Sequence, residues 1–182
     1  MLPPVGRPQK VRRAGDRWPR DHSMCLPESA TVRIVCQRVS SASVRVEDRQ
    51  VAAIGPGFCL LVGIARDDGE LEVDAAVDKI SGLRVFSDVE GKMNRSLREV
   101  GGEVLVVSQF TLLAAVGKGR RPSFTAAAPP DEAEPLVRRL AQGLRERGLT
   151  VAEGVFGARM EVALINEGPV TLILEVEGGA VR

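Results

Sequence analysis

The sequence predicts an α+β fold, in which a rolled or barrel-like antiparallel β-sheet carries two main helices on one side. Seven or more short runs rich in Val, Ile and Leu are bounded by Gly, Pro, Asp and Ser, which is typical of strands. Two segments place apolar residues at helical spacing, and many strands with few helices indicate an α+β domain. With 182 residues, the chain is long enough to bury one well-filled core.

The first half of the domain is expected to open as an antiparallel meander. Its first three strands cover residues 32–39, 43–47 and 51–54. The tripeptide Glu47-Asp48-Arg49 suits a hairpin connection. A tight turn at 54–57 leads into FCLLVGIA at 58–65, whose continuous apolarity predicts a strand covered on both faces.

Two amphipathic helices are expected. Residues 69–83 place Leu71, Val77 and Ile80 at mostly helical spacing with acidic residues between them. The second helix begins at Pro129-Pro130, carries acidic residues in its first turn and Arg in its last, and ends at Gly148. Between the helices we expect a short strand at 84–86, a polar loop at 88–102, a strand at 103–110 and a loop at 111–130.

The last part of the domain predicts strands at 149–156, 160–166 and 170–176. Only Glu167-Gly168-Pro169 separates the final two strands, so we expect a hairpin there. Its ladder would be interrupted because proline has no N–H to donate.

Residues 1–30 differ in composition from the rest of the chain. They contain five of the eleven prolines, six Lys or Arg, three Asp or Glu and no apolar periodicity. We expect a disordered Pro/Arg-rich extension, which is either a basic arm that touches RNA or the product of a start assigned upstream of Met24. Residues 31–177 are expected to form the single domain, followed by a flexible C-terminus at 178–182.

Composition excludes several classes of function. Lys and Arg number 25 against 24 Asp and Glu, and aromatic residues make up 3%, which disfavours strongly basic or aromatic-stacking nucleic-acid binders. The single histidine, His22, lies in the extension. The domain therefore has no Ser-His-Asp triad, no Cys-His pair and no His-containing zinc site. We expect neither a metal nor a cofactor.

The cysteines and the short apolar runs predict a soluble, cytoplasmic protein without a membrane partner. Cys25, Cys36 and Cys59 show no C-x-x-C spacing, and the last two lie in apolar runs, where buried reduced thiols are expected. No apolar run approaches the roughly 20 residues that span a bilayer.

Three short motifs place reactive side chains or special turn residues at strand ends, where a rigid scaffold presents them. The first is Ser108-Gln109-Phe110-Thr111, which closes the strand at 103–110. A strand that abruptly gains Ser, Gln and Thr either reaches solvent or lines a pocket.

The second motif is Asn166-Glu167-Gly168-Pro169-Val170-Thr171, and the third is Lys118-Gly119-Arg120-Arg121-Pro122-Ser123-Phe124. The Gly-Pro motif is either an ordinary turn or a rigid backbone element that recognises a small ligand by shape. The third motif, with three cations in four positions, suits phosphate contact or forms a solvated loop.

In this order, the motifs and the text around them resemble the D-aminoacyl-tRNA deacylases of the bacterial and eukaryotic cytosolic type. The resemblance spans residues 32–176 and includes QRVSSASVRV, GPGFCLLVGI, KISGLRVF, EGKMN, GGEVLVVSQFTLL, KGRRPSF, APPDEAE and GVFGARMEVALINEGPVTLIL. The pair of motifs S-Q-F-T and N-x-G-P-V-T makes it specific. The chain departs from the family at Leu113-Ala114-Ala115-Val116, where an aromatic and an acidic residue are frequent.

The resemblance implies a homodimer with its active site at the subunit interface. It implies aminoacyl-tRNA as the partner, bound by its 3′ end and acceptor stem, and no DNA. The wall that receives the ester and the terminal adenosine would be formed by Ser108, Gln109, Phe110 and Thr111. Substrate binding and chiral selection would fall to Asn166, Gly168, Pro169, Val170 and Thr171. Contacts to the tRNA backbone would come from Lys118, Arg120 and Arg121.

In such a family member the Gly168-Pro169 bond is cis, and its carbonyls exclude an L side chain from the partner's pocket. The implied activity is hydrolysis of D-aminoacyl-tRNA, with glycine mischarged on tRNA(Ala) as a second substrate because glycine has no side chain to clash. Without a histidine, we expect the tRNA 2′-hydroxyl to assist attack by water and backbone N–H groups near Gln109 and Phe110 to stabilise the oxyanion.

Three alternatives remain open at this stage. Thr111 could act as a covalent nucleophile, although no base is visible to take its proton. The chain could be a non-catalytic tRNA-end-binding protein of the same fold, which the altered residues 113–116 favour. It could also be an aliphatic β-domain whose Gly-Pro turn is purely structural.

Overall fold

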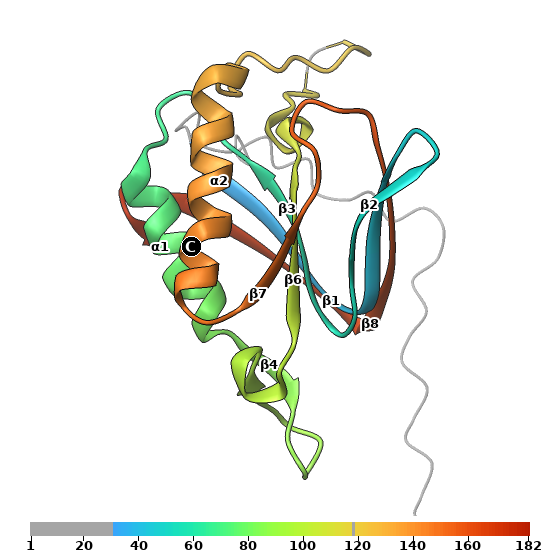
Figure 1. Ribbon diagram of the computed structural model, residues 1–182. Coiled ribbons are helices and arrows are strands. Elements are labelled where there is room, and N and C mark those ends of the chain that lie inside the picture. Colours follow the sequence, from blue (N-terminus) through green and yellow to red (C-terminus); the bar gives the residue numbers. More distant parts are fainter. Residues whose placement is uncertain (1–30, 118) are drawn as a thin grey trace, which may run out of the picture.

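The structure is a computed structural model that describes residues 31–117 and 119–182. The expected disordered extension at 1–30, with His22 and Cys25, and the expected phosphate contact Lys118 lie outside the described residues. One curled sheet is covered on one face by two helices (Figure 1). The predicted α+β class with two main helices is therefore confirmed.

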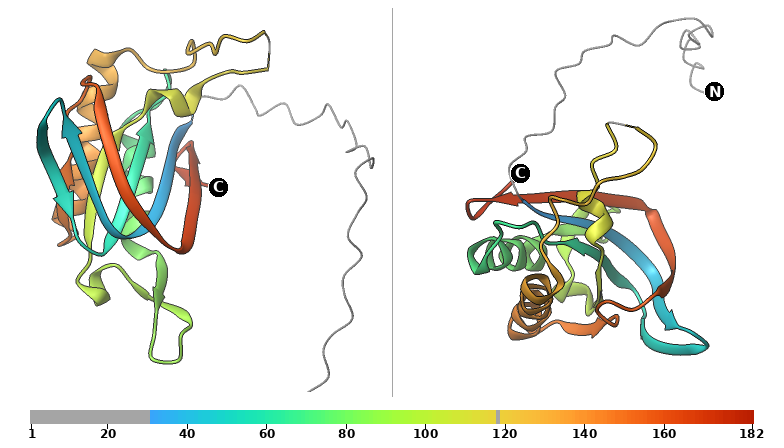
Figure 2. Two further views of the ribbon diagram at one scale, coloured as in Figure 1. Left: turned by 90° about the vertical axis from the view of Figure 1, so that its right-hand side faces the viewer. Right: turned by 90° about the horizontal axis from the view of Figure 1, so that it is seen from above.

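The main sheet has seven strands in the order β7-β6-β3-β1-β8-β9, and β2 pairs with the outer part of β1. Its strands are β1 (Val32–Val46), β2 (Arg49–Ile54), β3 (Gly57–Gly63), β6 (Glu103–Ser108), β7 (Thr150–Glu153), β8 (Met160–Glu177) and β9 (Ala180–Val181). The sheet curls around the long strands β1 and β8 (Figure 2).

The helices α1 (Glu70–Gly82) and α2 (Pro130–Glu146) lie side by side on the same face of the sheet (Figures 1 and 2). A capping interaction starts α1, because the Glu72 carboxylate accepts a 2.9 Å hydrogen bond from the Gly69 N–H. Proline at the first position starts α2, and Gly148 follows its end with φ of 79°. No helix in the described residues is long and apolar enough to cross a membrane.

The prediction of a purely antiparallel sheet is wrong, because three of the seven strands have a parallel neighbour. Strand β3 pairs with β6 in parallel, and β6 pairs with β7 in parallel. The reason is that each helix forms a crossover: α1 lies between β3 and β6 in the chain, and α2 lies between β6 and β7. Because β3, β6 and β7 run in the same direction, their carboxyl ends lie at the same end of the sheet.

The long strands differ from the predicted short ones. The strands expected at 32–39 and 43–47 are one strand, β1, because β2, β3 and β8 supply ladder partners along it and a bulge absorbs the polar Ser40-Ser41 pair. The strands expected at 160–166 and 170–176 form no hairpin. Both belong to β8 and pair with β1.

Smaller elements also differ from the prediction. The loop expected at 88–102 contains β5 (Met93–Ser96), which pairs with β4 (Arg84–Ser87), and a short helix, η1 (Arg98–Val100). The C-terminus, expected to be flexible, forms β9, and the Arg182 N–H donates to the Glu175 carbonyl at 2.8 Å. These backbone hydrogen bonds order the segment.

Two large apolar clusters and a small third one fill the described part of the fold. The larger one lies between the sheet and the helices and includes Ile34, Phe58, Ile80 and Leu140. The second lies on the opposite face of the sheet and includes Val39, Val44 and Leu105. Cys36 and Cys59 are free and buried, one in each large cluster, as predicted.

Candidate active site

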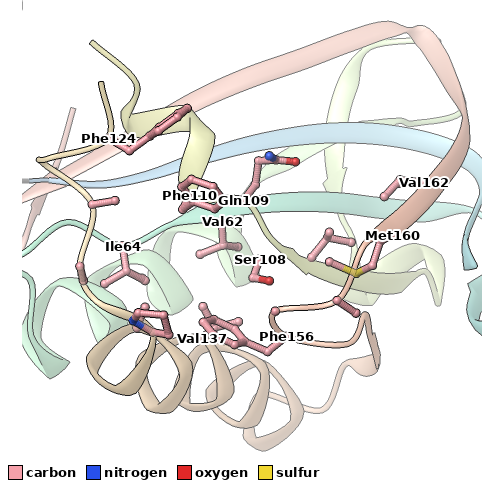
Figure 3. Close-up of a pocket in the computed structure, with 17 residues that line it drawn as sticks. Val62, Ile64, Ser108, Gln109, Phe110, Phe124, Val137, Phe156, Met160 and Val162 are labelled. Carbon is pink, nitrogen blue, oxygen red and sulfur yellow. The ribbon is translucent and has the colours of Figure 1, made fainter. Parts of the chain in front are cut away.

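A cavity of about 510 Å³ opens where the carboxyl ends of β3 and β6 meet α2 (Figure 3). Most of its wall is apolar, and the labelled side chains include Val62, Ile64, Val137, Phe156, Met160 and Val162. None of the described residues that line the cavity has an acidic or basic side chain. The cavity therefore suits an apolar or aromatic group and offers a reacting ester few polar partners.

Three residues of the predicted catalytic motif line this cavity: Ser108, Gln109 and Phe110. The strand ends at Ser108, two residues earlier than predicted, because the chain turns into the short 3₁₀-helix η2 (Phe110–Leu113). Thr111 is exposed and does not line the cavity. Its Oγ1 accepts a short hydrogen bond from the Gln109 side-chain amide.

The backbone N–H groups of this turn have different partners. The Gln109 N–H donates to the Val62 carbonyl at 2.7 Å, so it is unavailable to an oxyanion. Within the described part of the chain, no protein atom accepts a hydrogen bond from the Phe110 N–H. Of the two expected backbone donors, Phe110 is therefore the one left free for a ligand.

Two exposed aromatic rings meet at the mouth of the cavity. Phe110 and Phe124 contact edge to face, with ring centroids 5.1 Å apart. Phe124 follows the loop that carries Arg120 and Arg121, and the base of this loop is closed by hydrogen bonds between Ala115 and Ser123. The predicted phosphate contacts Arg120 and Arg121 are exposed on this loop.

The Gly-Pro motif at 166–171 lies within β8 and does not line the cavity. The Gly168-Pro169 bond is cis, as the resemblance implies. Gln37 pairs with Thr171 and Val39 with Asn166, so residues 167–170 bulge from β8 opposite Arg38 alone. In this bulge Gly168 and Pro169 are both exposed.

Hydrogen bonds fix the ends of this bulge. Asn166 Nδ2 donates to the carbonyls of Arg38 and Val170, both at 2.9 Å. Thr171 Oγ1 donates to Asn166 Oδ1 at 3.2 Å and accepts from Gln37 Nε2 at 3.3 Å. Asn166, Val170 and Thr171 thus support the Gly-Pro pair within its own chain.

Sequence reasoning did not single out Arg38, which lies against the bulge. Arg38 is 8% exposed, donates to the Val85 carbonyl and has its Nε 3.4 Å from a Glu167 carboxylate oxygen. The available signal was a charged residue inside the apolar run VRIVCQRV. Phe156, Met160 and Val162 of the cavity wall were also missed, because isolated apolar residues have no distinctive spacing.

The cysteine thiols are unsuited to nucleophilic chemistry. Burial raises the pKa of Cys36 to about 12, with a smaller contribution from Cys59, and burial raises the pKa of Cys59 to about 11. Since the thiolate is the nucleophile, both groups are inert near neutral pH. Neither thiol lines the cavity.

Comparisons with known proteins identify the family of the chain. The family model for D-Tyr-tRNA(Tyr) deacylase matches residues 35–175. A D-aminoacyl-tRNA deacylase from Heliobacterium modesticaldum is 56% identical over 81% of this chain and 99% of its own length. One from Symbiobacterium thermophilum is 53% identical over 80% of this chain and 97% of its own length.

Two solved structures share the fold. The c-Myc DNA Unwinding Element Binding Protein is 42% identical with a TM-score of 0.74, over 80% of this chain and 99% of its own. A probable eukaryotic D-amino acid tRNA deacylase is 22% identical with a TM-score of 0.70, over 80% of this chain and 100% of its own. The family model and the bacterial relatives cover nearly the whole described domain. The chain therefore belongs to the D-Tyr-tRNA(Tyr) deacylase family.

Proposed function

We propose that this protein is a hydrolase that cleaves the ester bond of D-aminoacyl-tRNA in the cytoplasm and releases the free D-amino acid and tRNA. The observation that carries the proposal is the placement of Ser108, Gln109 and Phe110 at the wall of an apolar cavity in a chain of this family. The cavity accepts the terminal adenosine, and the turn at its wall faces the ester.

The chemistry proceeds without a protein base. The Phe110 N–H is free to donate to the developing oxyanion, and Ser108 Oγ supplies a second donor at the same wall. The neighbouring 2′-hydroxyl of the ribose assists attack by water on the ester carbonyl. Positioning of an already activated ester supplies several kcal/mol of barrier lowering, about 7–11 kcal/mol in well-oriented model reactions.

The hydrogen bonds of Thr111 disfavour it as the nucleophile. Its Oγ1 accepts a hydrogen bond from the Gln109 side-chain amide, and a primary amide is not a base that could remove the hydroxyl proton of Thr111. Thr111 also lies outside the cavity wall. We assign it to positioning of Gln109.

Chiral selection requires a second copy of the chain. Gly168 and Pro169 do not line the cavity of their own chain, and they project from β8 between Ile165 and Ile173, which are 63% and 64% exposed. Burial of these apolar side chains favours association through this face. In the resulting homodimer each Gly-Pro bulge enters the partner's cavity, and its carbonyls reject an L side chain.

Glycine would escape this filter. Glycine has no side chain to contact the bulge, so a site that selects by steric rejection of the L side chain discriminates poorly against it. Glycine mischarged on tRNA(Ala) is therefore a second substrate in this proposal.

Arg120 and Arg121, with Lys118, would bind the phosphates of the tRNA acceptor stem beside the cavity mouth. The relative named for a DNA unwinding element makes DNA the competing ligand. A competition experiment with duplex DNA separates the two. We expect tRNA to reduce the amide hydrogen exchange of Phe124 and of the loop that carries Arg120 and Arg121. Duplex DNA of equal charge should neither do so nor displace the tRNA.

The non-catalytic alternative rests on the altered residues 113–116. Leu113 is buried with Ala65 and Ala127, and Ala115 pairs with Ser123, whereas the Ala115 and Val116 side chains are exposed. The changed sequence of this segment leaves the cavity wall at Ser108 and Phe110 in place.

The test is release of D-tyrosine from D-tyrosyl-tRNA by the full chain. Multiple turnovers support the proposal, whereas stoichiometric binding without release supports the non-catalytic alternative. If the protein neither binds nor cleaves the charged tRNA, the Gly-Pro segment is structural only.

A further inference from the structure

The structure assigns a positioning role to Arg33, a residue outside all three sequence motifs, in a step that rests on the proposed function. Its guanidinium connects β1, β8 and the turn that carries Phe110. Arg33 Nε and Nη2 lie 2.8 Å and 2.7 Å from Glu175 Oε1, and Nη1 donates to the Leu112 carbonyl at 2.9 Å. Arg33 thus has one partner on the sheet and one in the turn.

The turn η2 lies directly on the sheet next to Arg33. Gly63 is the cross-strand partner of Arg33 on β3, and a Cβ built there would lie 3.1 Å from the Gln109 carbonyl oxygen and 3.3 Å from Leu112 Cβ. Because Gly63 has no Cβ, the turn can pack closely against β3 at this position. Arg33 fixes the turn from the neighbouring strand.

Two hydrogen bonds then define the orientation of the turn. At its start the Gln109 N–H donates to the Val62 carbonyl, and at its end the Leu112 carbonyl accepts from Arg33. Between these points lies the Phe110 N–H, the proposed oxyanion donor. Loss of the second attachment would leave the turn hydrogen-bonded to the sheet only at Gln109, so the direction of the Phe110 N–H would be less tightly fixed.

Glu175 orients Arg33 through charge-assisted hydrogen bonds. The side chains of Arg33 and Glu175 are 22% and 35% exposed, so solvent only partly screens the pair. Arginine suits this place because its planar fork bonds a carboxylate and a carbonyl in two directions at once. Lysine, with one ammonium group, would keep the charge but not both contacts in this geometry.

The experiment compares Arg33→Ala, Arg33→Lys and the control Arg182→Ala. The control breaks the 2.7 Å ion pair of Arg182 with Glu177 of β8 and leaves the hydrogen bonds of Arg33 in place. We expect Arg33→Ala to lower kcat for D-tyrosyl-tRNA about 10- to 100-fold with KM within about twofold. Arg33→Lys should fall between, and Arg182→Ala should match the wild type.

Amide hydrogen exchange supplies a readout that does not need activity. The Leu112 and Ala114 N–H groups close the turn on the Gln109 and Thr111 carbonyls. In Arg33→Ala their protection should fall while the amides of β3 and β6 keep theirs. A general loss of protection would show a merely structural role, and unchanged protection with unchanged kcat would equally overturn the proposal.

The two readouts separate this inference from the proposed function. If the wild-type protein releases no amino acid, the proposed function fails and the positioning of a catalytic donor fails with it, whatever the exchange data show. If the wild type is active and Arg33→Ala retains full kcat, only the role of Arg33 is wrong.

Discussion

The guanidinium of Arg38 lies against Gly168: a Cβ built on this glycine would be 2.9 Å from Arg38 Nη2. Gly168 also has φ of 112°, a conformation that L residues with a side chain rarely adopt. We expect Gly168→Ala to destabilise the fold by about 1–3 kcal/mol and to displace the bulge, with loss of discrimination between D and L esters. Urea unfolding and paired deacylation assays measure the two effects.

Gly178→Ala is the matched control for this change. Gly178 also has positive φ, 56°, but a Cβ there meets no atom within 4 Å. Gly178→Ala should lower the free energy of unfolding by about 1 kcal/mol, because alanine disfavours positive φ. It should leave the discrimination between D and L esters intact. Equal effects of the two changes on discrimination would contradict a role for the contact with Arg38.

Thr111→Ala should keep substantial deacylase activity. The change removes one hydrogen bond that holds Gln109, so we expect a loss of about fivefold to tenfold in kcat/KM. Thr111→Ser retains the hydroxyl and should be near wild type. A folded Thr111→Ala protein without activity, with circular dichroism unchanged, would instead identify Thr111 as the nucleophile.

Removal of Arg120 and Arg121 together should weaken tRNA binding uniformly, whatever amino acid is attached. Each lost phosphate contact reduces the steepness of the plot of log affinity against log salt concentration by about 0.7–0.9. The slope of the double alanine variant should therefore be shallower by up to about 2. Arg49→Ala, at the exposed start of β2, removes one positive charge away from this loop and should leave the slope unchanged. An unchanged slope in the double alanine variant would place the acceptor stem on another surface.

Asp68 should make the free energy of unfolding fall as pH rises from about 4 to about 6. Burial raises the pKa of Asp68 to about 6 despite the 2.5 Å hydrogen bond its carboxylate accepts from the Ala65 N–H. Because the folded state holds the proton more tightly than the unfolded chain, Asp68 lowers stability as pH rises from about 4 to about 6, and the loss persists above pH 6.

Asp68→Asn isolates this contribution. Other carboxylates, such as Asp74 beside Arg139, have pKa values lowered in the fold and act in the opposite direction. The difference in unfolding free energy between wild type and variant should therefore change between pH 4 and 6 and be flat above pH 7. A constant difference across this range would show that the pKa of Asp68 is not raised.

How far the sequence predicts this molecule depends on the range of the interactions involved. Local patterns were sufficient for both helices, because the acidic first turn and the prolines before residue 131 act within a few residues. The parallel pairing of β3 with β6 was missed, since it depends on where the α1 crossover returns the chain. The hairpin expected around Pro169 failed for a similar reason, because both segments found their partner in β1.

The candidate site divides in the same way. Ser108 and the Gly168-Pro169 pair stand out in the sequence because polar or turn residues interrupt apolar strands. Arg33 and Arg38 also interrupt an apolar strand, but the sequence does not show what their side chains contact. Their roles arise from contacts with residues 79 and 47 positions away, Leu112 and Val85, which only the folded chain brings together.

The most direct test is the ratio of kcat/KM for D-tyrosyl-tRNA to that for L-tyrosyl-tRNA, measured with the full chain under the same conditions. A site that admits the D ester and rejects the L side chain sterically predicts a ratio of about 100 or more. Equal cleavage of the two esters, or cleavage of neither, would contradict it.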